Sequence, residues 1–119
     1  MNRFERIKGE LRPLLDPPRF SRDNLVAIEE ACERYFLNAP ALKPLSARTD
    51  AGIYLLRGLA SDIAGLWNPD APITADRVDA LRDGPWSAYK RFALAVLDDP
   101  ESDHLRLFQK TLSAILAFP

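Results

Sequence analysis

Hydrophobic residues recur every three or four positions along most of this chain, which is the period of an α-helix that packs on one side. Prolines and small polar residues separate the periodic stretches, and no stretch alternates at the period of two expected of a half-buried strand. The pattern therefore predicts an all-α protein. The expected helices cover approximately residues 2–15, 21–37, 49–68, 74–83, 85–98 and 99–118.

Polar residues stand where several of these helices should begin. Asn2 and Ser21 have side chains that can accept hydrogen bonds from the free amides of a helix N-terminus. Thr74 lies between Ile73 and Val78, the arrangement in which an apolar pair fixes the chain around a capping hydroxyl. These residues predict the starts of the first, second and fourth helices.

Proline and glycine predict where helices end. Pro13 should break or kink the first helix, and Asp83-Gly84-Pro85 should end the fourth and open the fifth. Asp99 is expected to cap the last helix, with Pro100 at its first position. The predicted buried face of that helix consists of Leu105, Phe108, Leu112, Ile115 and Leu116.

The third predicted helix carries the widest apolar arc and is expected to lie at the centre of the fold. We predict a compact single domain of five to six short helices packed around this helix, at about residues 49–68. Because the helices are unequal and the connections rich in proline, we expect an irregular orthogonal array more than an up-and-down bundle. The apolar arc comprises Gly52, Ile53, Leu56, Leu59, Ile63, Leu66 and Trp67.

Two glycines one heptad apart, Gly58 and Gly65, lie beside this apolar arc. A glycine inside a helix lowers the stability of the helix by about 0.5–1 kcal/mol relative to alanine. Two glycines on the same side of one helix therefore suggest a surface that lacks side chains so that another backbone can approach closely. Ala51 aligns with both glycines, and Asp62 lies between them. We interpret these four residues as a contact face. The sequence favours packing against another helix of the same fold, and a partner-binding face and a notch for a small molecule are the alternatives.

Composition limits the classes of partner. The formal net charge of -1 over 119 residues provides no global field to hold an anionic polymer. The single cysteine, Cys32, excludes an internal disulfide and fits a cytoplasmic setting. The charged N-terminus lacks the apolar core of a secretory signal, and no run has the length of a membrane span, so we expect no membrane partner. Twelve arginines against four lysines agree with a GC-rich, bacterial genome.

The residue inventory argues against most catalytic chemistry. With one histidine, His104, and one cysteine, the chain lacks the ligands of a zinc site and the usual residues of a nucleophile–histidine pair. The scattered glycines form no phosphate-binding loop, and the acidic run of residues 98–103 fails the ligand spacing of a calcium loop. We expect no enzyme, no metal and no cofactor. A weaker hypothesis is an enzyme that uses Asp62 or His104 with arginines.

A local excess of basic residues at the N-terminus supports an alternative. These side chains could lie along a phosphate backbone, with Trp86 and Tyr89 as aromatic neighbours, although both aromatics also coincide with the expected core. The candidate nucleic-acid contacts are Arg3, Arg6, Lys8, Arg12, Arg19, Arg22, Lys90 and Arg91.

The sequence thus favours a non-catalytic helical interaction subunit or adaptor that acts through helix faces, in a homo-oligomer or a larger assembly. This interpretation is favoured by the exclusion of other functions and by the glycine face. It is also favoured by the apolar residues 115–119, which need to be buried against another surface. The alternative is a small helical subunit of a nucleoprotein complex that contacts phosphates through its arginines.

Overall fold

The computed structural model describes residues 2–37, 47–67 and 72–119, and these residues are helical apart from short connections. The all-α prediction is confirmed, and no strand occurs in the described part of the chain. The helices are α1 (Arg3–Leu15), α2 (Arg22–Leu37), α3 (Ala47–Ala64), α4 (Ala75–Leu81), α5 (Ser87–Asp98) and α6 (Leu105–Leu116), with a π-helical turn, η2 (Arg82–Trp86).

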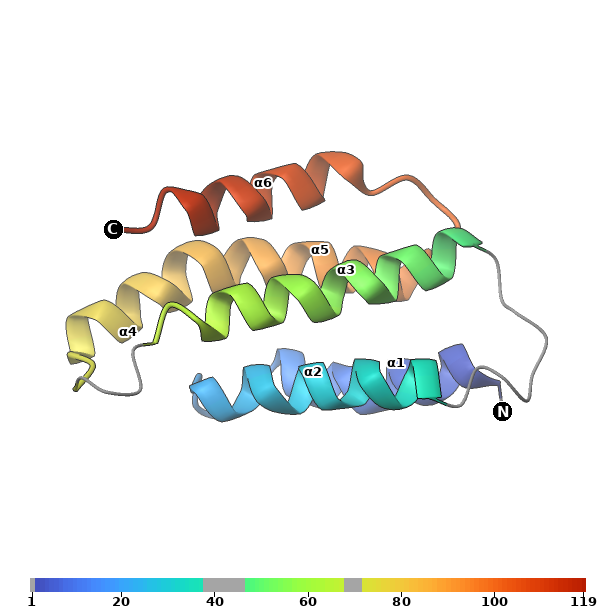
Figure 1. Ribbon diagram of the computed structural model, residues 1–119, viewed down its shortest axis with the longest axis horizontal. Helices are drawn as coiled ribbons and strands as arrows, with labels where there is room; N and C mark the ends of the chain where they lie inside the picture. Colours follow the sequence, from blue (N-terminus) through green and yellow to red (C-terminus); the bar gives the residue numbers. More distant parts are fainter. Residues whose placement is uncertain (1, 38–46, 68–71) are drawn as a thin grey trace.

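The helices lie lengthwise in three layers (Figure 1), in a body of 45 × 26 × 22 Å. One layer contains α1 and α2, the next α3 and α5, and the last α6 alone. α3 contacts helices in all three layers, namely α2, α5 and α6, which confirms its central position. The orthogonal array was a wrong prediction: the unequal lengths are accommodated because α4, η2 and α5 continue one another along the long axis.

The core forms where α3 meets α2 and α5. Ile53, Leu56 and Ile63 are fully buried on α3, and the Tyr89 hydroxyl of α5 donates a hydrogen bond of 2.9 Å to the Leu56 carbonyl. Phe92 of α5 is also buried. A buried hydroxyl with a partner costs little, so this bond fixes the position of α5 on α3 without weakening the core.

Two predictions of a helix break at proline were wrong. α1 runs through Pro13 to Leu15 without a break; the carbonyl that the proline ring approaches belongs to Gly9, an exposed residue. Gly84 and Pro85 do not separate two helices, because they form the π-helical turn that joins α4 to α5. Pro85 has no amide to donate, and the wider turn lets the Ser87 amide bond to the Arg82 carbonyl instead.

The last helix begins six residues later than predicted. Asp99 and Ser102 close a turn through their side chains, and Asp103 accepts a bond of 2.9 Å from the Leu105 amide. Asp99 therefore caps a local turn rather than α6, whose N-cap position belongs to His104. This local competition of acidic side chains for backbone amides delays the helix.

The end of α3 also differs from the prediction. The helix stops at Ala64, so Gly65 lies just after it and Asn68 lies outside the described residues. Gly65 donates a bond of 2.9 Å to the Ser61 carbonyl, as the closing turn of a helix does. Only Gly58 of the original pair is therefore an interior glycine of α3.

Gly52, not Gly58, is the glycine of α3 on which internal packing depends. A Cβ atom at Gly52 would lie 3.1 Å from Cγ1 of Val96, whereas one at Gly58 would have no neighbour within 4 Å. Alanine gains the same helix propensity at both sites, but only at position 52 must it displace a buried, β-branched side chain. We expect Gly58→Ala to raise the free energy of unfolding by about 0.5–1 kcal/mol. In parallel urea titrations, the free energy of unfolding of Gly52→Ala should be about 1 kcal/mol lower than that of Gly58→Ala.

Two buried tyrosine hydroxyls and one buried thiol, groups that ionise only at high pH, predict that the protein loses stability there. Burial raises the pKa of the Cys32 thiol from 9.0 to about 12, and burial also raises the pKa values of Tyr35 and Tyr89. The Cys32 thiol ionises at a lower pH in the unfolded chain than in the folded one. Its contribution to the free energy of unfolding is therefore complete below pH 9 and is lost as the pH rises towards 12. Chemical denaturation should show a fall of about 1.4 kcal/mol per pH unit per group, and Cys32→Ala should have a shallower fall.

Candidate functional site

The partner-binding residues predicted on α3 lie at the surface. Ala51, Asp62 and Gly65 are exposed and Gly58 is half-buried, with open space where its Cβ would stand. The favoured interpretation, that this row packs against another helix of the same fold, is therefore wrong within the part of the chain that the structure describes. The row remains available to a second molecule.

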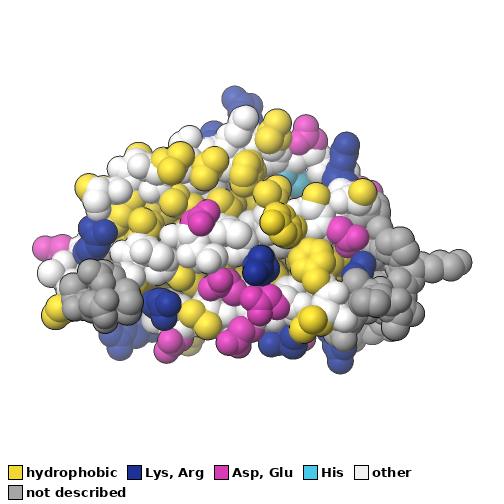
Figure 2. All heavy atoms as spheres, in the orientation of Figure 1, with side chains coloured by type: hydrophobic (Ala, Val, Ile, Leu, Met, Phe, Trp, Pro, Cys, Tyr) yellow, Lys and Arg dark blue, Asp and Glu magenta, His cyan; other side chains and the backbone are white. Residues whose placement is uncertain are grey.

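An apolar row of α6 runs beside this surface. Leu105 and Leu116 are 54% and 75% exposed, and Phe108 and Leu112 between them are only half-buried. Here the predicted buried face was partly wrong: Ile115 is buried, but one edge of the stripe is uncovered because α6 forms a layer by itself. Figure 2 shows hydrophobic side chains gathered over α6.

The two rows meet in a groove. At one end a pocket of about 290 Å³ is lined by Ala51, Gly52 and Leu55 of α3 and by Leu105 and Phe108 of α6. We call this surface the α3–α6 face. It comprises Ala51, Leu55, Gly58 and Asp62 of α3, and Leu105, Phe108, Leu112 and Leu116 of α6.

Asp62 is the one charged residue of α3 with no partner among the described residues. Arg48 donates to the Glu101 carbonyl at 3.1 Å, Asp50 pairs with Arg3 at 3.2 Å, and Arg57 pairs with Glu33 at 3.5 Å. Asp62 therefore stands as a free hydrogen-bond acceptor within a surface that is otherwise small or apolar.

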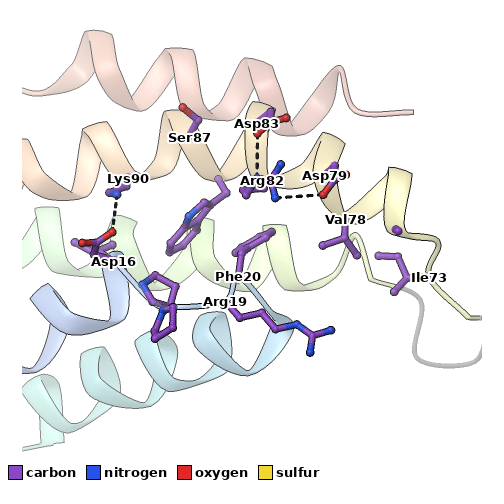
Figure 3. A pocket seen from close by; sticks show the side chains of 15 residues that line it. Asp16, Arg19, Phe20, Ile73, Val78, Asp79, Arg82, Asp83, Ser87 and Lys90 are labelled. Carbon is purple, nitrogen blue, oxygen red and sulfur yellow. Dashed lines mark hydrogen bonds and ion pairs between the residues drawn. The ribbon is translucent and has the colours of Figure 1, made fainter.

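A larger cleft lies on another part of the molecule (Figure 3). It measures about 840 Å³ and separates the connection between α1 and α2 from one face of α4, η2 and α5. Phe20 and Trp86 form its base, with ring centroids 5.0 Å apart in a stacked arrangement. This cleft was not predicted from the sequence, although the run Asp-Pro-Pro-Arg-Phe at residues 16–20 is a signal of a rigid, irregular connection.

The charges around this cleft mostly bind one another. Arg82 lies 3.2 Å from Asp79 and 3.1 Å from Asp83, and Lys90 lies 3.4 Å from Asp16 (Figure 3). The bond to Asp83 is the main reason that the pKa of Arg82 is raised. Ligand sites need several free polar groups that converge. Outside these ion pairs, the described lining offers the hydroxyl of Ser87 and the side chain of Arg19, which is exposed and has no ion-pair partner there.

Arg3 is not available to nucleic acid. Its side chain is buried, donates to Asp50 at 3.2 Å, and lies 4.3 Å from the centre of the Tyr35 ring. The Tyr35 hydroxyl donates to the same carboxylate at 2.6 Å. We call Arg3, Tyr35 and Asp50 the N-terminal clamp, because they tie together the start of α1, the end of α2 and the start of α3.

Two of the other candidate phosphate contacts are held in ion pairs. Arg12 pairs with Asp98 at 2.6 Å, and Lys90 pairs with Asp16 across the cleft. The remaining candidates have no ion-pair partner among the described residues and are exposed, except for the half-buried Lys8: Arg6, Lys8, Arg19, Arg22 and Arg91.

Metal-binding side chains do not gather among the described residues. No group of three or more histidine, cysteine, aspartate or glutamate side chains is placed to hold a metal ion there. Nε2 of His104 lies 2.6 Å from the Asp99 carbonyl, and Cys32 is fully buried. None of the helices in the described ranges has the length and apolarity needed to cross a membrane.

Comparison with known proteins adds no further restriction. No protein-family model matches this chain, and neither the curated proteins nor the solved structures gave a significant match.

Proposed function

We propose that this chain is a non-catalytic interaction subunit that binds another protein chain through the α3–α6 face. The observation that carries the proposal is the uncovered apolar edge of α6, where Leu105 and Leu116 are 54% and 75% exposed, beside the small residues Ala51 and Gly58 of α3. An apolar row next to a row of small residues is a surface into which a helix can pack closely.

The energetics support binding at this face. Full burial of a leucine side chain contributes about 1.5–3 kcal/mol, so covering Leu105 and Leu116 gives a substantial gain. Ala51 and Gly58 lose almost no side-chain entropy when they are covered. Asp62 is then a polar group at one end of the α3 row, which fixes the position of a partner that donates to it.

Leu116→Glu tests the proposal, with Leu37→Glu as its control. The two leucines are almost equally exposed, at 75% and 77%, but Leu37 lies on α2. We expect the tagged wild-type chain, purified from its native host, to have a molar mass above that of the monomer by light scattering. Leu116→Glu should reduce that mass to the monomer value, and Leu37→Glu should leave it unchanged.

Two results would contradict the proposal. One is a wild-type chain that purifies as a monomer, and the other is an assembly that tolerates Leu116→Glu. A high ratio of absorbance at 260 nm to that at 280 nm, lost in high salt, would favour the nucleoprotein alternative instead. We place the subunit in a cytoplasmic setting as part of the same proposal, which the free thiol of Cys32 fits.

A further inference from the structure

The cleft of Figure 3, which we call the Phe20 cleft, has a rigid floor and a rigid wall. The centroid of the Phe20 ring lies 5.2 Å from that of Trp67 and 5.0 Å from that of Trp86, so packing on two sides fixes the floor. Pro17 and Pro18 form part of the wall, and each proline ring fixes its own φ angle. The volume of about 840 Å³ lies within the range of about 300–1,000 Å³ found for ligand pockets. The cleft is therefore formed before a ligand arrives, which reduces the free-energy cost of binding.

In each described ion pair that lines the Phe20 cleft, the cation is less exposed than its carboxylate. The side chain of Lys90 is 38% exposed, and that of Asp16 is 88% exposed. The side chain of Arg82 is 50% exposed, and those of its partners Asp79 and Asp83 are 57% and 70% exposed. The positive groups therefore lie closer to the protein and the negative groups closer to solvent. This order makes the electrostatic potential more positive inside the cleft than at its rim.

The same cations keep hydrogen-bond donors for a ligand. Arg82 donates from Nε to Asp83 and pairs through Nη1 with Asp79, so its Nη2 has no partner among the described residues. An ammonium group has three N–H donors, and Lys90 has one described partner. Ion pairs with this exposure are weak, so an anionic group of a ligand can displace a carboxylate at little cost. Arg19, on the opposite wall, has no ion-pair partner in the described part of the chain.

Arg82 has the geometry to hold an oxyanion. Its planar guanidinium presents donors side by side, which matches the oxygens of a phosphate or a carboxylate. The two neighbouring carboxylates restrict the orientation of the guanidinium, so less conformational entropy is lost on binding. Val78 lies one helical turn before Arg82 and lines the same cleft, followed by Ile73 (Figure 3). A charged donor group is thus next to an apolar surface.

We propose that the Phe20 cleft binds a small organic anion, whose phosphate or carboxylate group pairs with Arg82 and whose apolar body covers Val78 and Ile73. Lys90 and Arg19 add to the positive potential that attracts this anion. The proposal goes beyond the binding of another protein chain, because the cleft lies on a different part of the molecule from the α3–α6 face.

Nuclear magnetic resonance titration of the isotope-labelled wild-type chain tests this site with three probes: phenyl phosphate, phenylacetate and benzyl alcohol. All three contain a benzene ring, but only the first two are anions. The anions should shift the amide signals of residues 82–90 and leave the signals of α6 in place. Because charge-assisted hydrogen bonds are the stronger ones, the tighter anion should bind at least about tenfold more tightly than benzyl alcohol. That anion identifies the charged group of the ligand.

Three variants test the role of Arg82. Arg82→Gln should weaken the binding of both anions by at least about tenfold, without changing the binding of benzyl alcohol. Arg91→Gln is the matched control, because Arg91 is exposed on α5 and does not line the cleft, and it should leave all three affinities unchanged. Asp83→Asn removes a carboxylate that competes for Arg82, so it should tighten the binding of the anions, a result that an unfolded chain cannot give.

The proposal is overturned if neither anion binds, or if benzyl alcohol binds as tightly as the anions. Equal affinity of the anions for the wild-type chain and for Arg82→Gln also overturns it. Shifts confined to the signals of α6 would place the probes on the α3–α6 face and have the same consequence.

Discussion

Leucine at position 58 is expected to weaken assembly by at least about 100-fold while leaving the fold intact. The Cβ of residue 58 points into open space, so the isolated chain can accept a side chain there without moving a neighbour. In the assembly the same side chain would occupy the groove that the partner needs. Light scattering over a dilution series measures the loss of assembly, and thermal unfolding measures the fold.

Gly9→Leu is the matched control for this variant. Gly9 is also an interior helical glycine whose Cβ would meet nothing within 4 Å, but it lies on α1. Both variants gain helix propensity, so both should unfold at or above the wild-type temperature. Dissociation of both variants, or of neither, would show that the α3 groove is not the contact.

The N-terminal clamp should give the largest loss of stability. Arg3→Met is expected to lower the free energy of unfolding by about 3 kcal/mol, because it removes one partner of a buried ion pair and leaves Asp50 without its cation. The side chain of Arg3 is only 4% exposed, whereas that of Asp50 is 31% exposed, so the loss belongs at the lower end of the range for buried pairs. Urea titration at pH 7 measures it.

Two further variants give this loss its interpretation. Arg12→Met removes an exposed pair, with Asp98, and should cost less than about 1 kcal/mol. Adding Asp50→Asn to Arg3→Met removes the uncompensated charge while keeping an acceptor for Tyr35, so it should restore part of the stability. Equal losses for Arg3→Met and Arg12→Met would mean that burial of the clamp has no energetic consequence.

The fold was largely predictable because apolar periodicity reflects burial. The stripes that placed Ile53, Leu56 and Ile63 inside were correct, and so was the Thr74 cap, which accepts a bond of 3.2 Å from the Arg77 amide. The errors arose at short sequences that are compatible with more than one backbone conformation. Gly84-Pro85 fits a break as well as a π-helical turn, and the tertiary packing of η2 on α6 selects the turn.

The candidate site was predictable on α3 and not on α6. Periodicity separates the apolar arc of α3 from the row containing Gly58, but it cannot show whether a neighbour covers that row. On α6 the same reasoning placed Leu105 and Leu116 inside, because a stripe does not reveal how many layers lie above it. Arg3 was assigned to the surface since charge alone predicts exposure, and its partners Tyr35 and Asp50 are distant in sequence.

Solvent protection of α6 in the working assembly tests the central claim most directly. Hydroxyl-radical footprinting compares the side chains of Leu105 and Leu116 in the assembly, purified from the native host, with those in the dissociated chain at high dilution. The account predicts that both leucines are oxidised several-fold more slowly in the assembly, while Leu37 on α2 reacts equally in both. Equal oxidation of Leu105 and Leu116 in the two samples would contradict it.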